Sequence, residues 1–149
     1  MTMSTTTVQD ILKKKGHDVV SVEPETTVLE AARQMNDKRI GAVVVFDAVH
    51  GVTGMFTERD VLMRVVGDGR SPEKTPVREV MSSPVTCCKP ATTVEECQSV
   101  MTSKRLRHLP VIEDGKLVGM VSVGDVVACE VQVQQTTIEY LHEYLHGRT

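Results

Sequence analysis

Gly54-Met55-Phe56-Thr57-Glu58-Arg59-Asp60 recurs in altered form as Gly119-Met120-Val121-Ser122-Val123-Gly124-Asp125. In both stretches a glycine and a short apolar run lead to a hydroxyl residue, and an aspartate follows three positions later. A Ser or Thr with an acid at that spacing, before an apolar-periodic run, is typical of a capped helix N-terminus. Each stretch therefore predicts a corner at which a strand turns into a helix.

Two interpretations of these corners stay open. In the first, Thr57 and Ser122 only cap their helices by accepting bonds from free backbone N–H groups. In the second, the helix N-terminus also attracts an anion, and the aspartate carboxylate accepts both hydroxyls of a ribose diol. The sequence leaves the same choice for Arg64, which can pair with Asp60 one turn earlier or reach a phosphate.

The repetition extends well beyond the corners. The corner glycines are 65 residues apart, and Thr27-Val28 aligns with Thr93-Val94 at almost the same offset. Hydrophobic periodicity predicts a short helix, a strand, a helix, two strands and the corner helix in each copy. The predicted segments are helices at 8–15 and 77–81, strands at 19–22 and 85–88, helices from Val28 and Val94, and strands at 42–46, 108–112, 52–56 and 117–121.

These segments predict two repeats with a polar linker. The first repeat covers 8–66, the linker 67–76, the second repeat 77–128, and an apolar-striped terminal helix covers 129–149. A unit of that size buries too little apolar surface alone. We therefore expect an α/β (α+β) fold in which two β-α-β-β-α repeats pack sheet to sheet with pseudo-two-fold symmetry.

Composition narrows the function classes. A formal net charge of −3, with no Trp, two Tyr and two Phe, argues against a nucleic-acid partner. Four cysteines include the adjacent pair Cys87-Cys88 but no CxxC spacing, which favours reduced thiols over a zinc knuckle, and buried small residues over a redox switch. The sequence shows neither a leader nor a membrane-spanning run, so we expect a cytoplasmic protein with no membrane partner.

The most specific stretches are Arg105 to Ile112, Gly115 to Asp125, and the first corner with its Thr-Glu-Arg-Asp string. On the basis of these stretches, the chain resembles a stand-alone tandem pair of CBS (cystathionine-beta-synthase) domains, called a Bateman module. The resemblance implies a sensor that binds AMP, ADP, ATP or NAD(H), and sometimes S-adenosylmethionine, with AMP as the foremost expectation. It implies neither catalysis nor a catalytic cofactor.

The resemblance also implies a first nucleotide site that draws on both repeats. Asp60 would bind the ribose hydroxyls, Thr57 would lie near the phosphate, and Arg107 and His108 would meet the phosphates, since a guanidinium fork suits phosphate geometry. Basic residues at 104–108 also fit a helix C-terminus that interacts with its own dipole. The full set is Met55, Thr57, Asp60, Val85, Thr86, Leu106, Arg107 and His108.

A second, weaker site follows from the same pattern. Gly41-Ala42 stand where the other repeat has Arg107-His108, so this site lacks their cations. The hypothesis is therefore asymmetric: the Asp60 site binds phosphorylated nucleotides, whereas the Asp125 site is weak, empty or binds a nucleoside-like group. The implied residues are Val19, Val20, Ile40, Met120, Ser122 and Asp125.

Two rival functions come from other features. His142-Glu143-Tyr144-Leu145-His146 has the H-E-x-x-H spacing of zinc proteases, but no downstream third ligand follows it. We therefore expect no metal site and a solvated helix end. The other rival is a structural scaffold with vestigial pockets. Apolar positions on the flanking helices predict a homodimer, and the regulated effector protein is unknown.

Overall fold

Two compact units make up the described residues, 6–130, of this computed structural model. The Asp60 unit comprises residues 18–87 and 113–118, and the Asp125 unit comprises residues 6–17, 88–112 and 119–130. Both units combine helices with strands, which confirms the mixed class predicted from the sequence.

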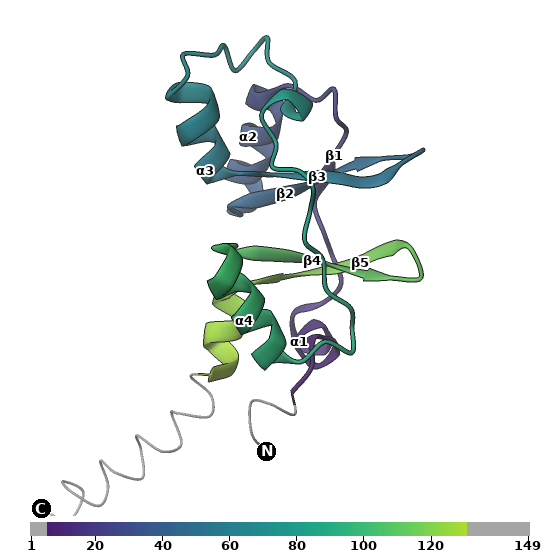
Figure 1. The fold of residues 1–149 in the computed structure, drawn as a ribbon. Coiled ribbons are helices and arrows are strands. Elements are labelled where there is room, and N and C mark those ends of the chain that lie inside the picture. The colour runs from purple at the N-terminus through teal and green to yellow at the C-terminus, as the bar shows by residue number, and fades with distance from the viewer. Residues whose placement is uncertain (1–5, 131–149) are drawn as a thin grey trace, which may run out of the picture. The chain divides into compact units, whose positions relative to one another are not determined.

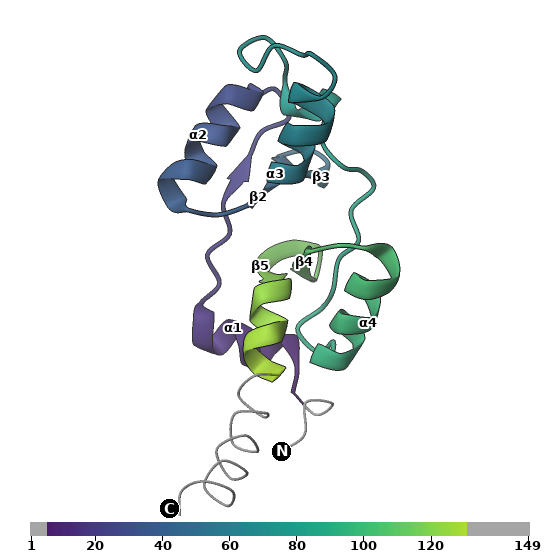
Figure 2. The same cartoon turned by 90° about the vertical axis from the view of Figure 1, so that its left-hand side faces the viewer.

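The Asp60 unit is a small sheet with helices on one face (Figures 1 and 2). Strand β1 pairs in parallel with β2, and β2 pairs antiparallel with β3. Apolar side chains between the sheet and the helices form the core, in which Phe56 and Val43 are fully buried. The elements are β1 (Ser21–Val22), α2 (Val28–Lys38), β2 (Ala42–Asp47), β3 (Gly51–Thr57), α3 (Glu58–Asp60), η2 (Val61–Val66) and η3 (Val77–Glu79).

The Asp125 unit repeats this plan with a two-stranded sheet. Its helices lie on one face of the β4–β5 hairpin (Figures 1 and 2). The hairpin turns at Asp114 and Gly115, whose φ angles of 51° and 77° are those of a tight two-residue turn. The elements are α1 (Val8–Lys15), α4 (Val94–Lys104), β4 (His108–Glu113), β5 (Lys116–Ser122) and a helix over residues 123–130, and only the turn end of the hairpin, residues 113–118, counts with the Asp60 unit.

The two repeats exchange their first segments, which are α1 with its flanking residues in the first repeat and η3 with the residues up to Ser82 in the second. The N–H of Val8, in the first repeat, donates to the carbonyl of Thr92 at 2.8 Å, and the N–H of Val77 donates to the carbonyl of Thr26 at 2.8 Å. Helix α1 therefore completes the Asp125 unit, and η3 completes the Asp60 unit. Each unit needs chain from both halves of the sequence.

The corner glycines show the same exchange. A Cβ at Gly119 would lie 2.7 Å from Cδ2 of Leu12, and a Cβ at Gly54 would collide with Met81. Leu12 and Met81 occupy equivalent places in the repeats, because Leu12 follows Val8 by four residues and Met81 follows Val77 by four. Each corner therefore accepts a side chain from the other repeat only because the corner residue is glycine.

Most predicted elements are confirmed, with three exceptions. Residues 85–88 form no strand, and only Cys88 makes a bridge, parallel to Val111. The predicted helix at 77–81 is one 3₁₀ turn, η3. The corner helix of the first repeat continues as a π-helix, η2, in which the N–H of Gly67 donates to the carbonyl of Leu62.

The predicted terminal helix beyond residue 130 lies outside the described residues. Among residues 6–130, the structure contains no helix with the length and apolar character needed to cross a membrane.

Candidate functional site

The first corner is a capped helix start. The side-chain oxygen of Thr57 accepts a bond from the N–H of Asp60 at 3.3 Å. In return, Oδ2 of Asp60 accepts from the N–H of Thr57 at 3.0 Å. This reciprocal arrangement confirms the predicted cap and fixes the carboxylate against the end of β3. Glu58 and Arg59, between them, are exposed.

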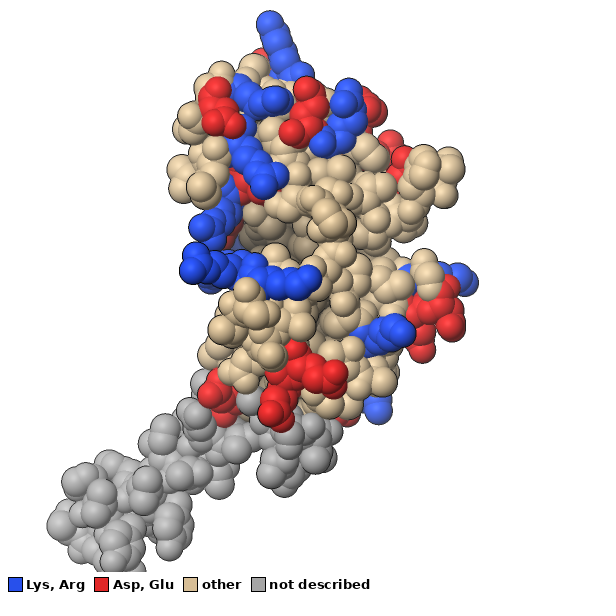
Figure 3. Space-filling view, viewed as in Figure 1, with Lys and Arg blue, Asp and Glu red and all other residues tan. Residues whose placement is uncertain are grey.

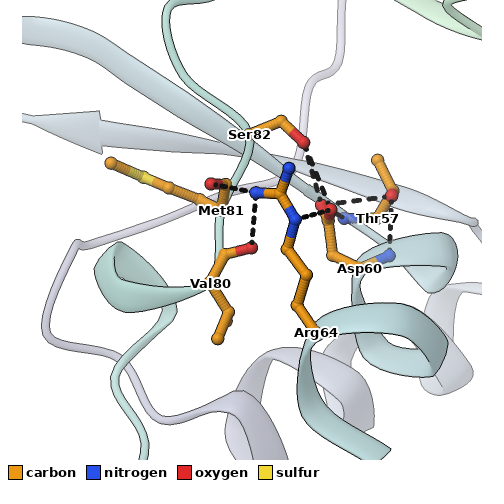
Figure 4. A network of polar contacts seen from close by, with 6 residues as sticks. All are labelled: Thr57, Asp60, Arg64, Val80, Met81 and Ser82. Carbon is orange, nitrogen blue, oxygen red and sulfur yellow. Dashed lines mark hydrogen bonds and ion pairs between the residues drawn. The ribbon is translucent and has the colours of Figure 1, made fainter. Parts of the chain in front are cut away.

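The carboxylate of Asp60 is buried and surrounded by donors (Figure 4). Oδ2 accepts from the hydroxyl of Thr57 at 3.2 Å, and Oδ1 accepts from the hydroxyl of Ser82 at 3.2 Å. Nε of Arg64 forms an ion pair with Oδ1 at 3.7 Å. The two hydroxyls are of particular interest because a ribose diol would also present two O–H donors to a carboxylate.

Arg64 connects the corner to the first segment of the second repeat. Its Nη1 donates to the carbonyl of Met81 at 2.9 Å and contacts that of Val80 at 3.4 Å (Figure 4). Of the two roles that the sequence left open, the structure shows the pair with Asp60. The guanidinium also satisfies carbonyls at the end of η3, so it holds two elements together.

The other predicted residues of the Asp60 unit lie on β3 and after η3. Met55 is buried on β3, and its backbone exchanges two hydrogen bonds with Ser82, at 3.0 and 2.8 Å. Val85 and Thr86 follow that bridge and are half-buried. These positions belong to the same unit as Thr57 and Asp60.

Leu106, Arg107 and His108 belong to the Asp125 unit, at the junction of α4 and β4. Helix α4 ends at Arg105, whose φ of 56° is left-handed. Lys and Arg side chains gather over this end of α4 (Figure 3). Arg107 is exposed and forms no ion pair among residues 6–130, while its carbonyl accepts from the N–H of Val123 at 2.8 Å. That these residues meet a ligand bound at Asp60 stays a prediction.

The second corner has the same cap and a different cation. The N–H of Asp125 donates to Oγ of Ser122 at 3.1 Å, and the N–H of Ser122 donates to Oδ2 of Asp125 at 2.8 Å. Nζ of Lys15, from α1, donates to Oδ2 at 2.8 Å and to the carbonyl of Met120 at 2.9 Å. A lysine of the first repeat thus neutralises the corner aspartate of the second.

Val19, Val20 and Ile40, predicted for the second site, belong to the Asp60 unit. The carbonyl of Val20 accepts from the N–H of Val44, and the side chains of Val20 and Ile40 pack on the core of this unit. A Cβ at Gly41, which stands where the other repeat has Arg107, would lie 3.1 Å from the carboxylate of the exposed Glu58, so a side chain there would require Glu58 to move. Convergence of the two groups of predicted residues stays a prediction.

Of the adjacent cysteines, Cys88 is buried as predicted for a small core residue, whereas Cys87 is exposed. A hydrogen bond with Cys88 lowers the pKa of the buried Cys97 thiol. Residues 6–130 contain no cluster of His, Cys, Asp and Glu suited to a metal ion. The His142 to His146 string lies outside the described residues.

Sequence reasoning missed Lys15 and Ser82 as partners of the corner aspartates. Both residues come from the first segment of the opposite repeat, so no local motif links them to Asp125 or Asp60. The only available signal was the duplication itself, which shows that the first segments are repeated but not that they are exchanged.

Comparison with known proteins gives two matches to one family. The family model for the CBS domain matches residues 8–67 and 77–131. CBS domain-containing protein CBSX3, mitochondrial, of Arabidopsis thaliana is 33% identical over 150 residues, covering 95% of this chain and 73% of the relative.

Two solved structures are also similar. A CBS-domain containing protein of Agrobacterium tumefaciens is 42% identical with a TM-score of 0.79, covering 84% of this chain and 99% of the other. A putative signal-transduction protein with CBS domains from Burkholderia ambifaria is 38% identical with a TM-score of 0.81, covering 85% and 95%.

Proposed function

Since this chain belongs to the CBS domain family, with one match in each half, we propose that it is a regulatory module that binds an adenine nucleotide and transmits the occupancy as a change in shape or association. The observation that carries the proposal is the Asp60 carboxylate. It is buried, anchored by the cap of its own helix, and accepts bonds from two hydroxyls, those of Thr57 and Ser82. A ribose diol offers a carboxylate the same kind of donor pair.

The phosphates of this ligand would bind to Arg107 and His108. Arg107 is exposed and forms no ion pair within residues 6–130, and a guanidinium makes paired bonds to phosphate oxygens. Met55, Thr57, Val85, Thr86 and Leu106 complete the first site, in which the adenine edge is read by the backbone of residues 85–86. AMP, with one phosphate, is the simplest ligand that would place a ribose at Asp60 and a phosphate at Arg107 and His108.

The Asp125 site is the weaker of the two in this proposal. It comprises Val19, Val20, Ile40, Met120, Ser122 and Asp125, and it has Gly41-Ala42 in place of the arginine and histidine. A nucleoside-like group, or none, would occupy it.

Association is the proposed output because the corner helix of the first repeat exposes apolar side chains. Leu62, Met63 and Val66 of η2 are 65%, 56% and 65% exposed, and Val127 of the helix at 123–130 is 47% exposed. Exposed apolar side chains on each of these helices favour a homodimer. For the nucleotide to regulate the protein, it must bind one arrangement of the protein more tightly than another. An effector protein would then respond to the change in arrangement.

A thermal-shift panel with AMP, ADP, ATP, NADH, S-adenosylmethionine and adenosine tests the proposal. A ligand at 100 times its dissociation constant adds about 2.7 kcal/mol to the free energy of unfolding, which is a clear shift. A flat panel would contradict nucleotide binding. It would favour a structural scaffold, which the complete satisfaction of the buried Asp60 carboxylate by protein donors also fits.

Titration calorimetry then tests the assignment of residues. Asp60→Ala should abolish most AMP binding, whereas Asp125→Ala should change it little, and equal losses would contradict the asymmetry. Arg107→Ala should weaken AMP by about 1.5–3 kcal/mol, the value of a charge-assisted bond, and leave adenosine unchanged. If AMP and adenosine weaken alike, Arg107 does not bind the phosphate.

A further inference from the structure

The hydroxyl of Ser82 lies against both oxygens of the Asp60 carboxylate. It is 3.2 Å from Oδ1 and 3.5 Å from Oδ2 (Figure 4). The backbone of Ser82 is fixed, because its N–H and carbonyl both bond to Met55 on β3. The hydroxyl can therefore leave the carboxylate by rotation of the side chain, with no change in the chain path.

Protein donors use most of the acceptor positions of Asp60. A carboxylate offers about four acceptor positions. Oδ2 takes the N–H and the hydroxyl of Thr57, which belong to the cap and hold the carboxylate in place. Oδ1 faces Nε of Arg64 at 3.7 Å, too far for a strong hydrogen bond, and so its accepted hydrogen bond comes from Ser82. A diol needs this oxygen.

We propose that Ser82 sets the affinity of the Asp60 site for a ribose. Its hydroxyl occupies the position of a ribose hydroxyl in the ligand-free protein and rotates away when the diol binds. This inference rests on the proposed nucleotide function and adds a competing residue to it. The observed affinity is the intrinsic affinity reduced by the fraction of molecules in which Ser82 has released Oδ1.

The second corner lacks this competitor. Alignment of Val8 with Val77 places Lys13 opposite Ser82, and Lys13 forms no bond to Asp125. There the competing group is the ammonium of Lys15, and the Asp125 side chain is 22% exposed compared with 7% for Asp60. Serine competition is thus specific to the Asp60 site.

Calorimetric titration of the full chain with AMP and with 2′-deoxy-AMP tests the role of Ser82. In Ser82→Ala, AMP should bind roughly three- to tenfold more tightly, which is the value of about one net hydrogen bond. 2′-Deoxy-AMP has only one of the two diol hydroxyls, so its gain should be smaller. Ser83→Ala is the matched control, because Ser83 is exposed and bonds to the carbonyl of Thr53, and its AMP affinity should equal that of the wild type.

Ser82→Thr retains a hydroxyl and should restore an affinity near that of the wild type. Weaker or unchanged AMP binding in Ser82→Ala, in a variant whose thermal unfolding shows a folded protein, would overturn the role of Ser82 while leaving the nucleotide function intact. If neither the wild type nor Ser82→Ala binds any adenine nucleotide, the proposed function fails and this inference fails with it.

Discussion

Nζ of Lys15 lies 2.8 Å from Oδ2 of Asp125, although 110 residues separate the two in the sequence. The lysine ends α1, in the first repeat, and the aspartate lies in the first turn of the corner helix of the second. Because the same ammonium also donates to the carbonyl of Met120, it ties α1 to both sides of the corner. The exchange of first segments therefore has an electrostatic component as well as an apolar one.

Lys15→Ala should lower the free energy of unfolding by about 0.5–1 kcal/mol, the range for a partly exposed ion pair. Urea denaturation at low and high salt measures it, and the loss should shrink as salt screens the pair. Lys13→Ala is the matched control, since Lys13 lies in the same last turn of α1 but does not pair with Asp125. Equal losses in both variants would mean that only the helix dipole is involved.

Arg64→Ala should destabilise the protein more, by about 1–2 kcal/mol. The variant leaves the buried Asp60 carboxylate without its cation and the carbonyls of Val80 and Met81 without a side-chain donor. This expected loss of stability is smaller than that for a fully buried ion pair, because half of the Arg64 side chain is exposed. Chemical denaturation measures the loss. Arg59→Ala, at an exposed arginine in α3, about one turn earlier, should be near neutral.

The sequence predicted the elements well where the repeats agree. The strands leading to Thr57 and Ser122, the two caps and the helices that begin at Val28 and Val94 are all found. The helices also end alike, at Arg39 and Arg105, both with left-handed φ. Agreement between the two copies is strong evidence for a predicted helix or strand, because capping, periodicity and turn chemistry must all be satisfied twice.

Tertiary contacts were not predictable in the same way. Residues 85–88 have strand composition but make a single bridge, at Cys88, because strand formation depends on a paired neighbour more than on propensity. The partners of Asp60 and Asp125 come from segments that the repeats exchange, Ser82 and Lys15. Hydrophobic periodicity specifies a face, but it does not specify which copy covers that face.

Asp10→Asn should weaken the start of α1 in a pH-dependent manner. Hydrogen bonds from the backbone and hydroxyl of Thr7 lower the pKa of Asp10 below its ordinary value of 3.8. A lowered folded-state pKa means that the stabilisation is present above the unfolded pKa and is lost as the pH falls through the folded one. The urea midpoint of the variant should therefore fall below that of the wild type at neutral pH and converge with it in acid, below the lowered folded-state pKa of Asp10.

Glu95→Gln, at an exposed position in the first turn of α4, serves as the comparison for Asp10→Asn. A difference between Asp10→Asn and the wild type that persists unchanged at low pH would show that the carboxylate charge is not involved.

Gly119→Ala tests the close approach of α1 to the second corner. The added Cβ would lie 2.7 Å from Cδ2 of Leu12, which is fully buried and has little room to move. Overpacking of this kind costs about 1–3 kcal/mol, and the loss should appear as a lower unfolding midpoint in urea. Gly124→Ala is the matched control, because its nearest neighbour would be Oγ of Ser122 at 3.4 Å and alanine favours the helix at 123–130. The control should be neutral or stabilising. If Gly119→Ala were equally harmless, Leu12 would not be held against the corner, and the exchange of first segments would lose its main apolar contact.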